Sequence, residues 1–497
     1  MSIRIDKTLK TPVYVQIAAE IKRKILSAEM GVGTTLPSER ALASILCVHR
    51  NTVIKAYHEL IAEELIESVH GVGYVVVSPQ HEAGRRGQEE KLPKVRPKRV
   101  NWTNQIKPEY LDMEITFDDL FQRFGNEKIY ALGSGIPPAG MYDEKKVAAD
   151  ITDMVSGQGR SQYFYSPYKG DPFLRKKLAS FLSTKGIKVS SGQIQVLTET
   201  NQALDFIVML LIKPGDNVIM EEPVSPDVYR AMELAGAVIR TVPMDDFGMD
   251  CDMLEIMVQR YKPKFIYINS SFHDPTGMTL SMERRKKIIE ISNTYRIAIV
   301  EEDAASELVY EGSRMQPIKA FDTEENVIYI YSFSLTFMPG LSLAFVAGNK
   351  DLIRSMSYLV SVRMVGTDWL SQKLVAKYLD DGTYYGVLDN FRSTYSRKQK
   401  LVCEMLDTMK DIGVEYTKPS GGVYIWCKLP AGIDSKSFVS KAYSRGLAIL
   451  PGYIFYPFKN GGRDHIRINY SFETEERLQV GMNLLRQVLR EELAHKK

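Results

Sequence analysis

Two small hydroxyl side chains stand in a loop late in the chain, where an apolar run gives way to polar residues. The run Val327 to Tyr331 breaks into Ser332-Phe-Ser334-Leu335, and a Pro339-Gly turn leads into a second apolar run. Because open α/β sheets bind ligands where strands end, we expect this loop to face a ligand. Leu335 has no side-chain nitrogen or oxygen, so the loop offers hydrogen bonds from Ser332 and Ser334 and no nucleophile at that position.

Polar residues also stand at the predicted ends of other strands. The segment Thr198-Glu-Thr-Asn-Gln202 opens a helix after a strand, which is a natural position for a phosphate. The acidic cluster Glu301-Glu302-Asp303 ends another strand, and an Asp274-Pro-Thr-Gly turn precedes it. The four cysteines are scattered without metal-ligand or paired spacing, so we expect reduced thiols and no metal site.

Alternating strand-like and helix-like stretches must position these residues, which predicts an α/β domain over residues 115–497. A smaller α+β segment is expected from about Ser393 to the end. The predicted strands are Ile194–Leu197, Asn217–Met220, Val238–Val242, Phe265–Asn269, Ala298–Val300, Val327–Tyr331 and Leu343–Ala347.

A different pattern occupies residues 1–78. Apolar positions at helical spacing predict a first helix from Val13 to Leu26. Ser38 is a candidate N-cap for a short second helix, and a tight turn leads to a third helix that begins near His49. This arrangement fits a helix-turn-helix that places Arg50, Asn51 and Thr52 at the DNA major groove.

Two short strand patterns around a Gly-containing turn follow the third helix and predict a hairpin wing. Small residues at its tip, Gly71 and Gly73, would let the backbone approach DNA phosphates. The pattern alone also fits a generic three-helix unit with a charged surface.

The stretch 79–114 is expected to be a basic, extended linker, because Gln80 to Val100 contains seven basic and three acidic residues, two prolines and few apolar residues. It would add non-specific DNA affinity or act as an inert tether. The whole chain has 497 residues and a net charge of +3, so any basic footprint must be local. We find no signal-peptide pattern and no run long enough for a membrane span, and we expect a cytoplasmic protein.

The N-terminal motifs resemble the GntR-type winged helix-turn-helix over roughly residues 10 to 78. The resemblance rests on Pro12-Val-Tyr-Val-Gln, Leu36-Pro-Ser-Glu-Arg40, Arg50-Asn-Thr-Val, Ala56-Tyr and the Gly71-Val-Gly73 wing. It implies that double-stranded DNA is a partner. The implied contact residues are Arg40, His49, Arg50, Asn51, Thr52, His70, Gly71 and Gly73, although His49 replaces a residue that is usually small.

The ordered motifs of the large part resemble fold-type I, class I/II aminotransferases over about residues 130 to 490. They include Tyr165-Ser-Pro-Tyr-Lys-Gly, Glu222-Pro, Asp274-Pro-Thr-Gly, Pro419-Ser-Gly-Gly and Ile466-Arg467. With the N-terminal module, the chain resembles the MocR subfamily of GntR regulators. That resemblance implies pyridoxal phosphate as the family cofactor, a small-molecule effector (an amino acid or a B6-like compound) and a head-to-tail homodimer.

This chain departs from the family pattern where the cofactor would be held. Leu335 stands at the Schiff-base lysine, which pyridoxal phosphate requires, and Ser342 stands at the phosphate arginine. Glu302 replaces the usual Asp, and Glu199 adds negative charge near the phosphate position. The expected ligand residues that remain are Asn201, Gln202, Asp274, Glu302, Ser332, Ser334 and Arg467, the last matching the arginine that clamps a substrate carboxylate.

We therefore expect a DNA-binding regulator with a degenerate aminotransferase-like sensor domain that binds an amino compound or another small anion without a covalent link. No catalytic residue and no covalently bound cofactor are expected. Two alternatives remain, a pyridoxal-phosphate-dependent aminotransferase and a purely architectural dimerisation domain. Arg467 could equally serve a structural salt bridge, and Lys350 is a remote substitute for the missing amine.

Overall fold

The structure, a computed structural model, describes residues 3, 5–6, 11–27, 29–69, 73–77, 100, 102–107, 110, 128–138, 140–157 and 163–494. The chain divides into two compact units, Met1–Asn101 and Trp102–Lys497, and the division falls inside the predicted linker. Most of that linker lies outside the described residues. One short helix, α4 (Trp102–Gln105), occupies its later part.

The first unit contains the three predicted helices, α1 (Val13–Leu26), α2 (Glu39–Leu46) and α3 (Arg50–Ala62). Ile17, Ile21 and Ile25 recur every fourth position and bury one face of α1. Val53 and Tyr57 of α3 belong to the same core. The first helix was predicted correctly from helical spacing, and the other two from the Ser38 cap and the turn before His49.

Two caps and one left-handed residue define the ends of α2 and the start of α3. The Ser38 side chain accepts a hydrogen bond from the Ala41 amide at the start of α2. Cys47 ends that helix with φ 50°, and His49 Nδ1 accepts from the Asn51 amide at the start of α3. The strands β1 (Ile66–Val69) and β2 (Gly73–Val76) then pair antiparallel as the predicted hairpin. His70 and Gly71 lie outside the described residues.

The second unit is built on an eight-stranded sheet with the order β4-β11-β10-β9-β8-β5-β6-β7. Its strands are β4 (Ile194–Leu197), β5 (Asn217–Glu222), β6 (Val238–Asp245), β7 (Gly248–Met249), β8 (Phe265–Asn269), β9 (Ala298–Glu302), β10 (Val327–Ser332) and β11 (Ala344–Ala347). The five strands from β10 to β6 in this order are parallel, whereas β11 runs against β10 and β4, and β7 runs against β6. All seven predicted strands are present: β5, β6, β9 and β10 extend one to three residues further, β4 and β8 have the predicted bounds, and β11 begins one residue later.

Helices cover both faces of this sheet, which is why its central strands are apolar on both sides. Val218 and Met220 of β5 share one core with α8 (Thr200–Leu211), α9 (Pro226–Leu234) and α12 (Lys350–Arg363). Ile219, between them, belongs to a second core with α10 (Cys251–Tyr261) and α11 (Met282–Tyr295). Alternation along the strand thus sends neighbouring side chains to opposite faces.

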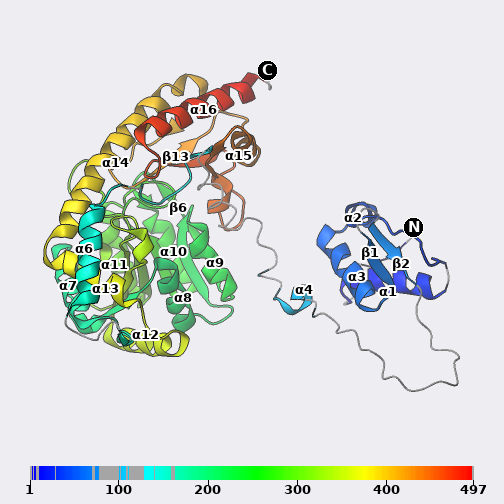
Figure 1. Cartoon of the computed structure of the whole chain (residues 1–497), viewed down its shortest axis with the longest axis horizontal. Helices are drawn as coiled ribbons and strands as arrows, with labels where there is room; N and C mark the ends of the chain where they lie inside the picture. The colour runs from blue at the N-terminus through cyan, green and yellow to red at the C-terminus, as the bar shows by residue number, and fades with distance from the viewer. Residues whose placement is uncertain are drawn as a thin grey trace. The chain divides into compact units, whose positions relative to one another are not determined.

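The remaining strands lie outside the large sheet. The strands β12 (Glu415–Tyr416), β13 (Tyr424–Lys428), β16 (His465–Asn469) and β15 (Leu450–Pro451) make an antiparallel sheet, and β14 (Leu447–Ala448) pairs with β3 (Tyr130–Ala131). The long helices α14 (Thr383–Asp407) and α16 (Glu475–Ala494) lie side by side (Figure 1). The other helices are α6 (Glu144–Ser156), α7 (Pro172–Thr184), α13 (Trp369–Asp380) and α15 (Ser435–Ser444).

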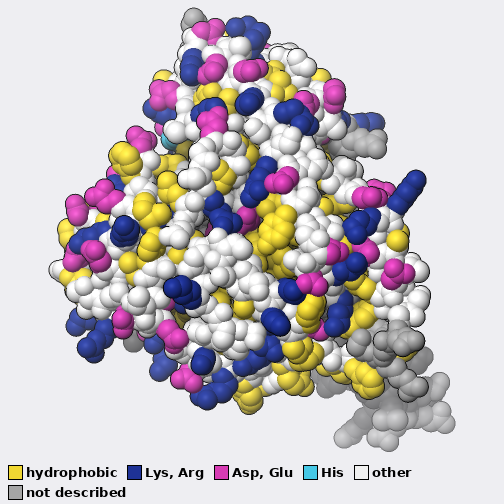
Figure 2. Space-filling model, turned by 90° about the vertical axis from the view of Figure 1, so that its left-hand side faces the viewer, with side chains coloured by type: hydrophobic (Ala, Val, Ile, Leu, Met, Phe, Trp, Pro, Cys, Tyr) yellow, Lys and Arg dark blue, Asp and Glu magenta, His cyan; other side chains and the backbone are white. Residues whose placement is uncertain are grey.

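Acidic and basic side chains are interspersed over the face that Figure 2 presents. Among the described residues, no helix is both long and apolar enough to cross a membrane.

Candidate functional sites

The carboxyl ends of the parallel strands bring most of the predicted ligand residues to one edge of the large sheet. Ser332 ends β10, Glu302 ends the neighbouring β9, and Asp274 lies in the loop after β8. Asn201 stands in the first turn of α8, directly after β4. We call this edge, with the residues that the smaller sheet adds to it, the strand-end site.

Arg467 enters the strand-end site from β16 of the smaller sheet and is already paired. Its Nη1 donates to Asp274 Oδ1 at 2.6 Å, and its Nη2 donates to the carbonyl oxygen of Gly133 at 3.0 Å. The side chain is only 7% exposed, and its guanidinium lies 4.5 Å from the ring centroid of Tyr424. The sequence left open whether Arg467 binds a ligand or a protein carboxylate. In this structure its guanidinium meets Asp274.

Glu302 accepts a hydrogen bond from the Tyr267 hydroxyl at 2.6 Å. Burial, followed by the negative charges of Asp274 and Asp227, raises the pKa of Glu302 from 4.5 to about 7, and the Tyr267 hydrogen bond only partly opposes this rise. Near neutral pH this carboxyl is therefore close to the point where it gains or loses a proton.

The other two acids of the predicted cluster do not belong to the strand-end site. Glu301 accepts hydrogen bonds from the Ser270 hydroxyl and from the amides of Ile318 and Lys319. Asp303 faces the buried ammonium group of Lys185 at 3.3 Å. Of the three consecutive carboxylates, only Glu302 is placed to meet a ligand.

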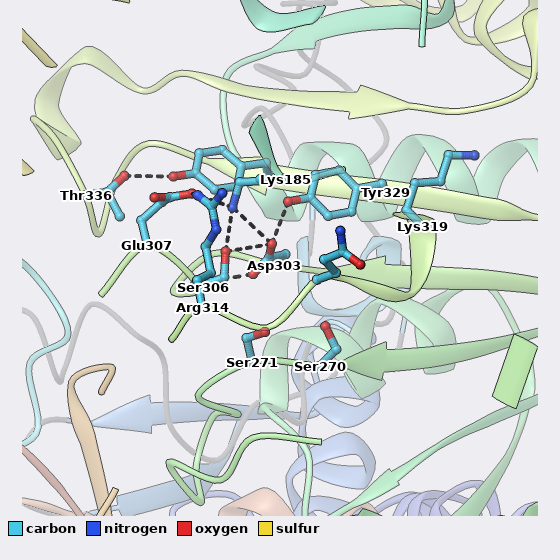
Figure 3. Close-up of polar contacts among 12 residues, drawn as sticks. Lys185, Ser270, Ser271, Asp303, Ser306, Glu307, Arg314, Lys319, Tyr329 and Thr336 are labelled. Carbon is cyan, nitrogen blue, oxygen red and sulfur yellow. Dashed lines mark hydrogen bonds and ion pairs between the residues drawn. The ribbon is translucent and has the colours of Figure 1, made fainter. Parts of the chain in front are cut away.

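A buried polar network takes up Lys185 and Asp303 (Figure 3). Lys185 Nζ lies 2.8 Å from Glu307 Oε1 and 2.5 Å from Ser306 Oγ, and Asp303 also accepts from the Tyr329 hydroxyl. Despite burial, the charge of Lys185 and these hydrogen bonds lower the pKa of Asp303. Because the Lys185 amine is paired with Asp303, Glu307 and Ser306 inside the protein, it is not free to act on a ligand.

Asp227 in the first turn of α9 is a site residue that the sequence analysis missed. Burial, together with the charge of Asp274, raises its pKa to about 6, although Arg230, Arg467 and a hydrogen bond from Asn201 act in the opposite direction. The pattern Ser225-Pro-Asp227, which is typical of a helix start after a strand, could have indicated that Asp227 lies at this edge of the sheet. Tyr267 and Tyr424 were missed because each lies in an apolar strand and reads as core.

Glu199 has a role that its sequence position did not indicate. It immediately precedes α8, and its two carboxylate oxygens accept hydrogen bonds from the hydroxyls of Ser332, at 3.1 Å, and Ser334, at 2.6 Å. The serines thus lie where predicted, but their partner is a side chain of the protein.

Three further positions named in the sequence analysis contact other parts of the protein. Gln202 Oε1 accepts from the amide and the hydroxyl of Thr198, both at 3.0 Å, and so stabilises the start of α8. Leu335 is partly buried against the core. Ser342 is exposed in a left-handed turn, and its hydroxyl is directed to the Pro339 carbonyl oxygen.

In the first unit, the predicted DNA-contact residues at the head of α3 form one exposed group. His49, Arg50 and Asn51 are exposed and Thr52 is partly buried. Arg40, in the first turn of α2, is exposed as well. These residues lie on α2 and at the start of α3, and Gly73 begins β2 of the wing.

Arg50 is restrained by a partner on α2. Its Nε and Nη2 both donate to Glu39 Oε2, at 3.0 and 2.6 Å, while Nη1 has no hydrogen-bond partner among the described residues. The other oxygen of Glu39 accepts from the Tyr74 hydroxyl of β2 at 2.7 Å. Glu39 thereby ties the third helix to the wing.

These two units define a chain that joins a winged helix-turn-helix to a fold-type I aminotransferase-like unit. Residues 127–484 match the family described as aminotransferase class I and II, and residues 13–76 match the gntR family of bacterial regulatory proteins. The chain belongs to the class I and II aminotransferase family and has the two-module architecture of MocR-type proteins.

Relatives and solved structures agree with this division. The chain is 29% identical over 486 residues to the uncharacterized HTH-type transcriptional regulator YdfD of Bacillus subtilis, covering 98% of both chains. It is 25% identical to the probable rhizopine catabolism regulatory protein MocR of Rhizobium meliloti, over 80% of this chain and 78% of that one. The kynurenine aminotransferase of Pyrococcus horikoshii superposes with a TM-score of 0.74 at 28% identity, covering 79% of this chain and 98% of the other.

Proposed function

We propose that the protein is a cytoplasmic, homodimeric transcriptional regulator that binds DNA through its first unit and a small amino compound, without a covalent bond, through its second. The observation that carries the proposal is the match to HTH-type regulators over nearly the full length of both chains. Aminotransferases without the helix-turn-helix match only 76% of the chain.

The strand-end site supports binding better than transamination. Leu335, at the position that corresponds by resemblance to the Schiff-base lysine, is packed against the core and offers no amine. Lys185 is buried and ion-paired, and Lys350 is exposed at the start of α12. Pyridoxal phosphate therefore does not fit the residues present as a covalently held cofactor.

Arg50 provides the test of DNA binding. Glu39 takes the Nε–H group and one Nη2–H group of Arg50, which leaves three N–H donors at the outer end of the guanidinium, and we expect these donors to contact a phosphate. Arg50→Ala should then weaken binding about tenfold on every sequence and reduce the salt slope by about 1. The measurement is binding to duplexes that the full chain selects from a random pool, over a range of salt concentrations.

Two further variants make this test specific. Arg354→Ala removes an exposed arginine from α12 of the other unit and should leave DNA binding unchanged. Asn51→Ala should change the preferred base at one position and leave the salt slope intact. If Arg50→Ala binds as the wild type does, α3 is not the DNA reader.

A chemical test separates a binding domain from an aminotransferase. The full chain is incubated with pyridoxal phosphate and then with borohydride, and its peptides are searched for a pyridoxyl group. We expect no modified lysine at the strand-end site. An adduct on a lysine there would restore the enzymatic alternative.

A ligand screen separates a sensor from an architectural dimeriser. A ligand that binds only the folded form must raise the melting temperature. We expect at least one amino acid, amine or B6 vitamer to stabilise the wild-type chain and to do so less in Asp227→Asn. If none of these compounds shifts the melting temperature, the architectural role gains support.

A further inference from the structure

The strand-end site contains an anion cradle that is already occupied. Glu199 is the residue before α8, and its carboxylate, which makes no hydrogen bond to the amides of that helix, is bound by the hydroxyls of Ser332 and Ser334. A helix N-terminus with nearby hydroxyl donors is a typical binding place for phosphate. Here the anion that the two hydroxyls bind is the side-chain carboxylate of Glu199.

The contacts to Glu199 use the donors that a phosphate would need. Ser332 Oγ lies 3.1 Å from Oε2 and Ser334 Oγ lies 2.6 Å from Oε1, so each carboxylate oxygen receives one hydroxyl. The Ser334 amide donates to Ser332 Oγ at 3.1 Å, which holds the two serines in place. A ligand phosphate could take these hydroxyls only by leaving a partly buried carboxylate without them, which is costly.

The surrounding charges oppose a second anion. Asp227, Asp274 and Glu302 share the strand-end site, and the guanidinium of Arg467 is held by Asp274 at 2.6 Å. Ser342, an uncharged residue where the family has an arginine, is exposed and donates its hydroxyl to the carbonyl oxygen of Pro339 in its own turn. Among the described residues, the strand-end site therefore combines three carboxyl groups with an arginine that is already paired, which disfavours a phosphate dianion.

We infer that Glu199 is an internal substitute for a ligand phosphate, which excludes phosphorylated compounds and restricts the strand-end site to unphosphorylated ligands. This inference rests on the proposed function only in treating the strand-end site as the effector site. Glu199 is a specificity-determining residue, because its carboxylate takes the serine hydroxyls that a ligand phosphate would need for tight binding.

The test compares pyridoxal phosphate, pyridoxal and inorganic phosphate as ligands of the full chain, by calorimetry and thermal shift. The variant Glu199→Ser removes the carboxylate and keeps a side chain that can cap α8. We expect wild type to bind pyridoxal phosphate no better than pyridoxal. Glu199→Ser should gain at least tenfold in affinity for pyridoxal phosphate, and inorganic phosphate should compete with it.

Controls make each outcome decisive. Glu199→Gln keeps the bulk of the side chain and should gain much less, whereas Glu290→Ser removes an exposed carboxylate of α11 and should change nothing. A tenfold preference of wild type for pyridoxal phosphate over pyridoxal would overturn the inference. A folded Glu199→Ser that gains no affinity would overturn it as well. If Glu199→Ser does not fold, Glu199→Gly replaces it.

DNA binding is measured separately on the same proteins. Loss of the proposed regulatory function would appear as failure of the wild type to bind any duplex, whatever its ligand preference. Failure of the inference would appear only in the phosphate measurements. The two results are thus independent.

Discussion

At the scale of single residues, the strand-end site is governed by which carboxylates already have partners. Asp274 is paired with Arg467, and Glu199 is bound by two serine hydroxyls. Glu302 receives one hydrogen bond from Tyr267, and its pKa is raised to about 7. Glu302 is therefore the acid whose protonation changes most readily near neutral pH.

The raised pKa of Glu302 has a defined consequence for stability. Between about pH 4.5 and pH 7 the folded chain keeps this proton while the unfolded chain loses it, so the contribution of Glu302 to stability falls as pH rises. Glu302→Gln, which stays neutral, should gain stability over wild type across this window, by up to about 3 kcal/mol. Denaturant unfolding of both proteins at several pH values measures the difference.

A control separates Glu302 from general charge effects. Glu324→Gln neutralises an exposed carboxylate and should show no such change with pH. Parallel stability profiles for wild type and Glu302→Gln would show that Glu302 ionises normally in the folded chain.

At the scale of elements, short local signals predicted the helices and strands well. The N-cap at Ser38 and the helical spacing of Ile17, Ile21 and Ile25 correctly indicated α2 and α1. The buried strands of the large sheet were recognisable because helices cover both faces, which requires apolar residues throughout. Local signals did not reveal that Glu39 links α3 to the wing, because that link depends on how three elements pack.

The turn between α2 and α3 contains strain that a substitution can relieve. Cys47 adopts φ 50°, a left-handed conformation that glycine adopts without a steric penalty. Cys47→Gly should therefore stabilise the first unit by about 0.5 kcal/mol, or leave it unchanged where the gain in unfolded-state entropy offsets the relief. Thermal unfolding of the first unit measures the shift.

Two comparisons isolate the backbone effect. Cys47→Ala removes the thiol and keeps the Cβ atom, so it should not stabilise. Cys47→Val, which is β-branched, should destabilise the unit. A Cys47→Val protein as stable as Cys47→Gly would mean that the turn holds no strain.

At the scale of the whole molecule, the two units each possess a core of their own. Residues of α1, α2, α3 and the wing form one apolar cluster, and the large sheet and its helices form separate ones. The chain division at Asn101 and Trp102 agrees with this separation. Each unit should consequently fold without the other.

The prediction at this scale concerns the first unit, residues 1–101, produced without the second unit. Residues 1–101 alone should fold and retain the α1–α3 helical content. They should bind the selected duplex at least about 100-fold more weakly than the full chain, because two linked modules bind with a higher effective concentration. Circular dichroism, sedimentation and DNA titration of both proteins measure this.

The oligomeric states of the two proteins show whether the difference in DNA affinity comes from dimerisation. The full chain should sediment as a dimer and residues 1–101 as a monomer. Equal DNA affinities would show that the second unit does not act as the dimerisation domain.

The sequence alone determined the modules, most element bounds and the absence of an amine at Leu335, since these follow from local periodicity, caps and residue type. Only the tertiary structure decided which side chains meet. Glu199 and Ser332 are 133 residues apart in the chain, and Arg467 and Asp274 are 193 apart. Such pairs depend on how strands are ordered in a sheet, and no local pattern encodes that order. For this reason the serines were predicted to face a ligand, and the structure shows that they hold a carboxylate of the protein itself.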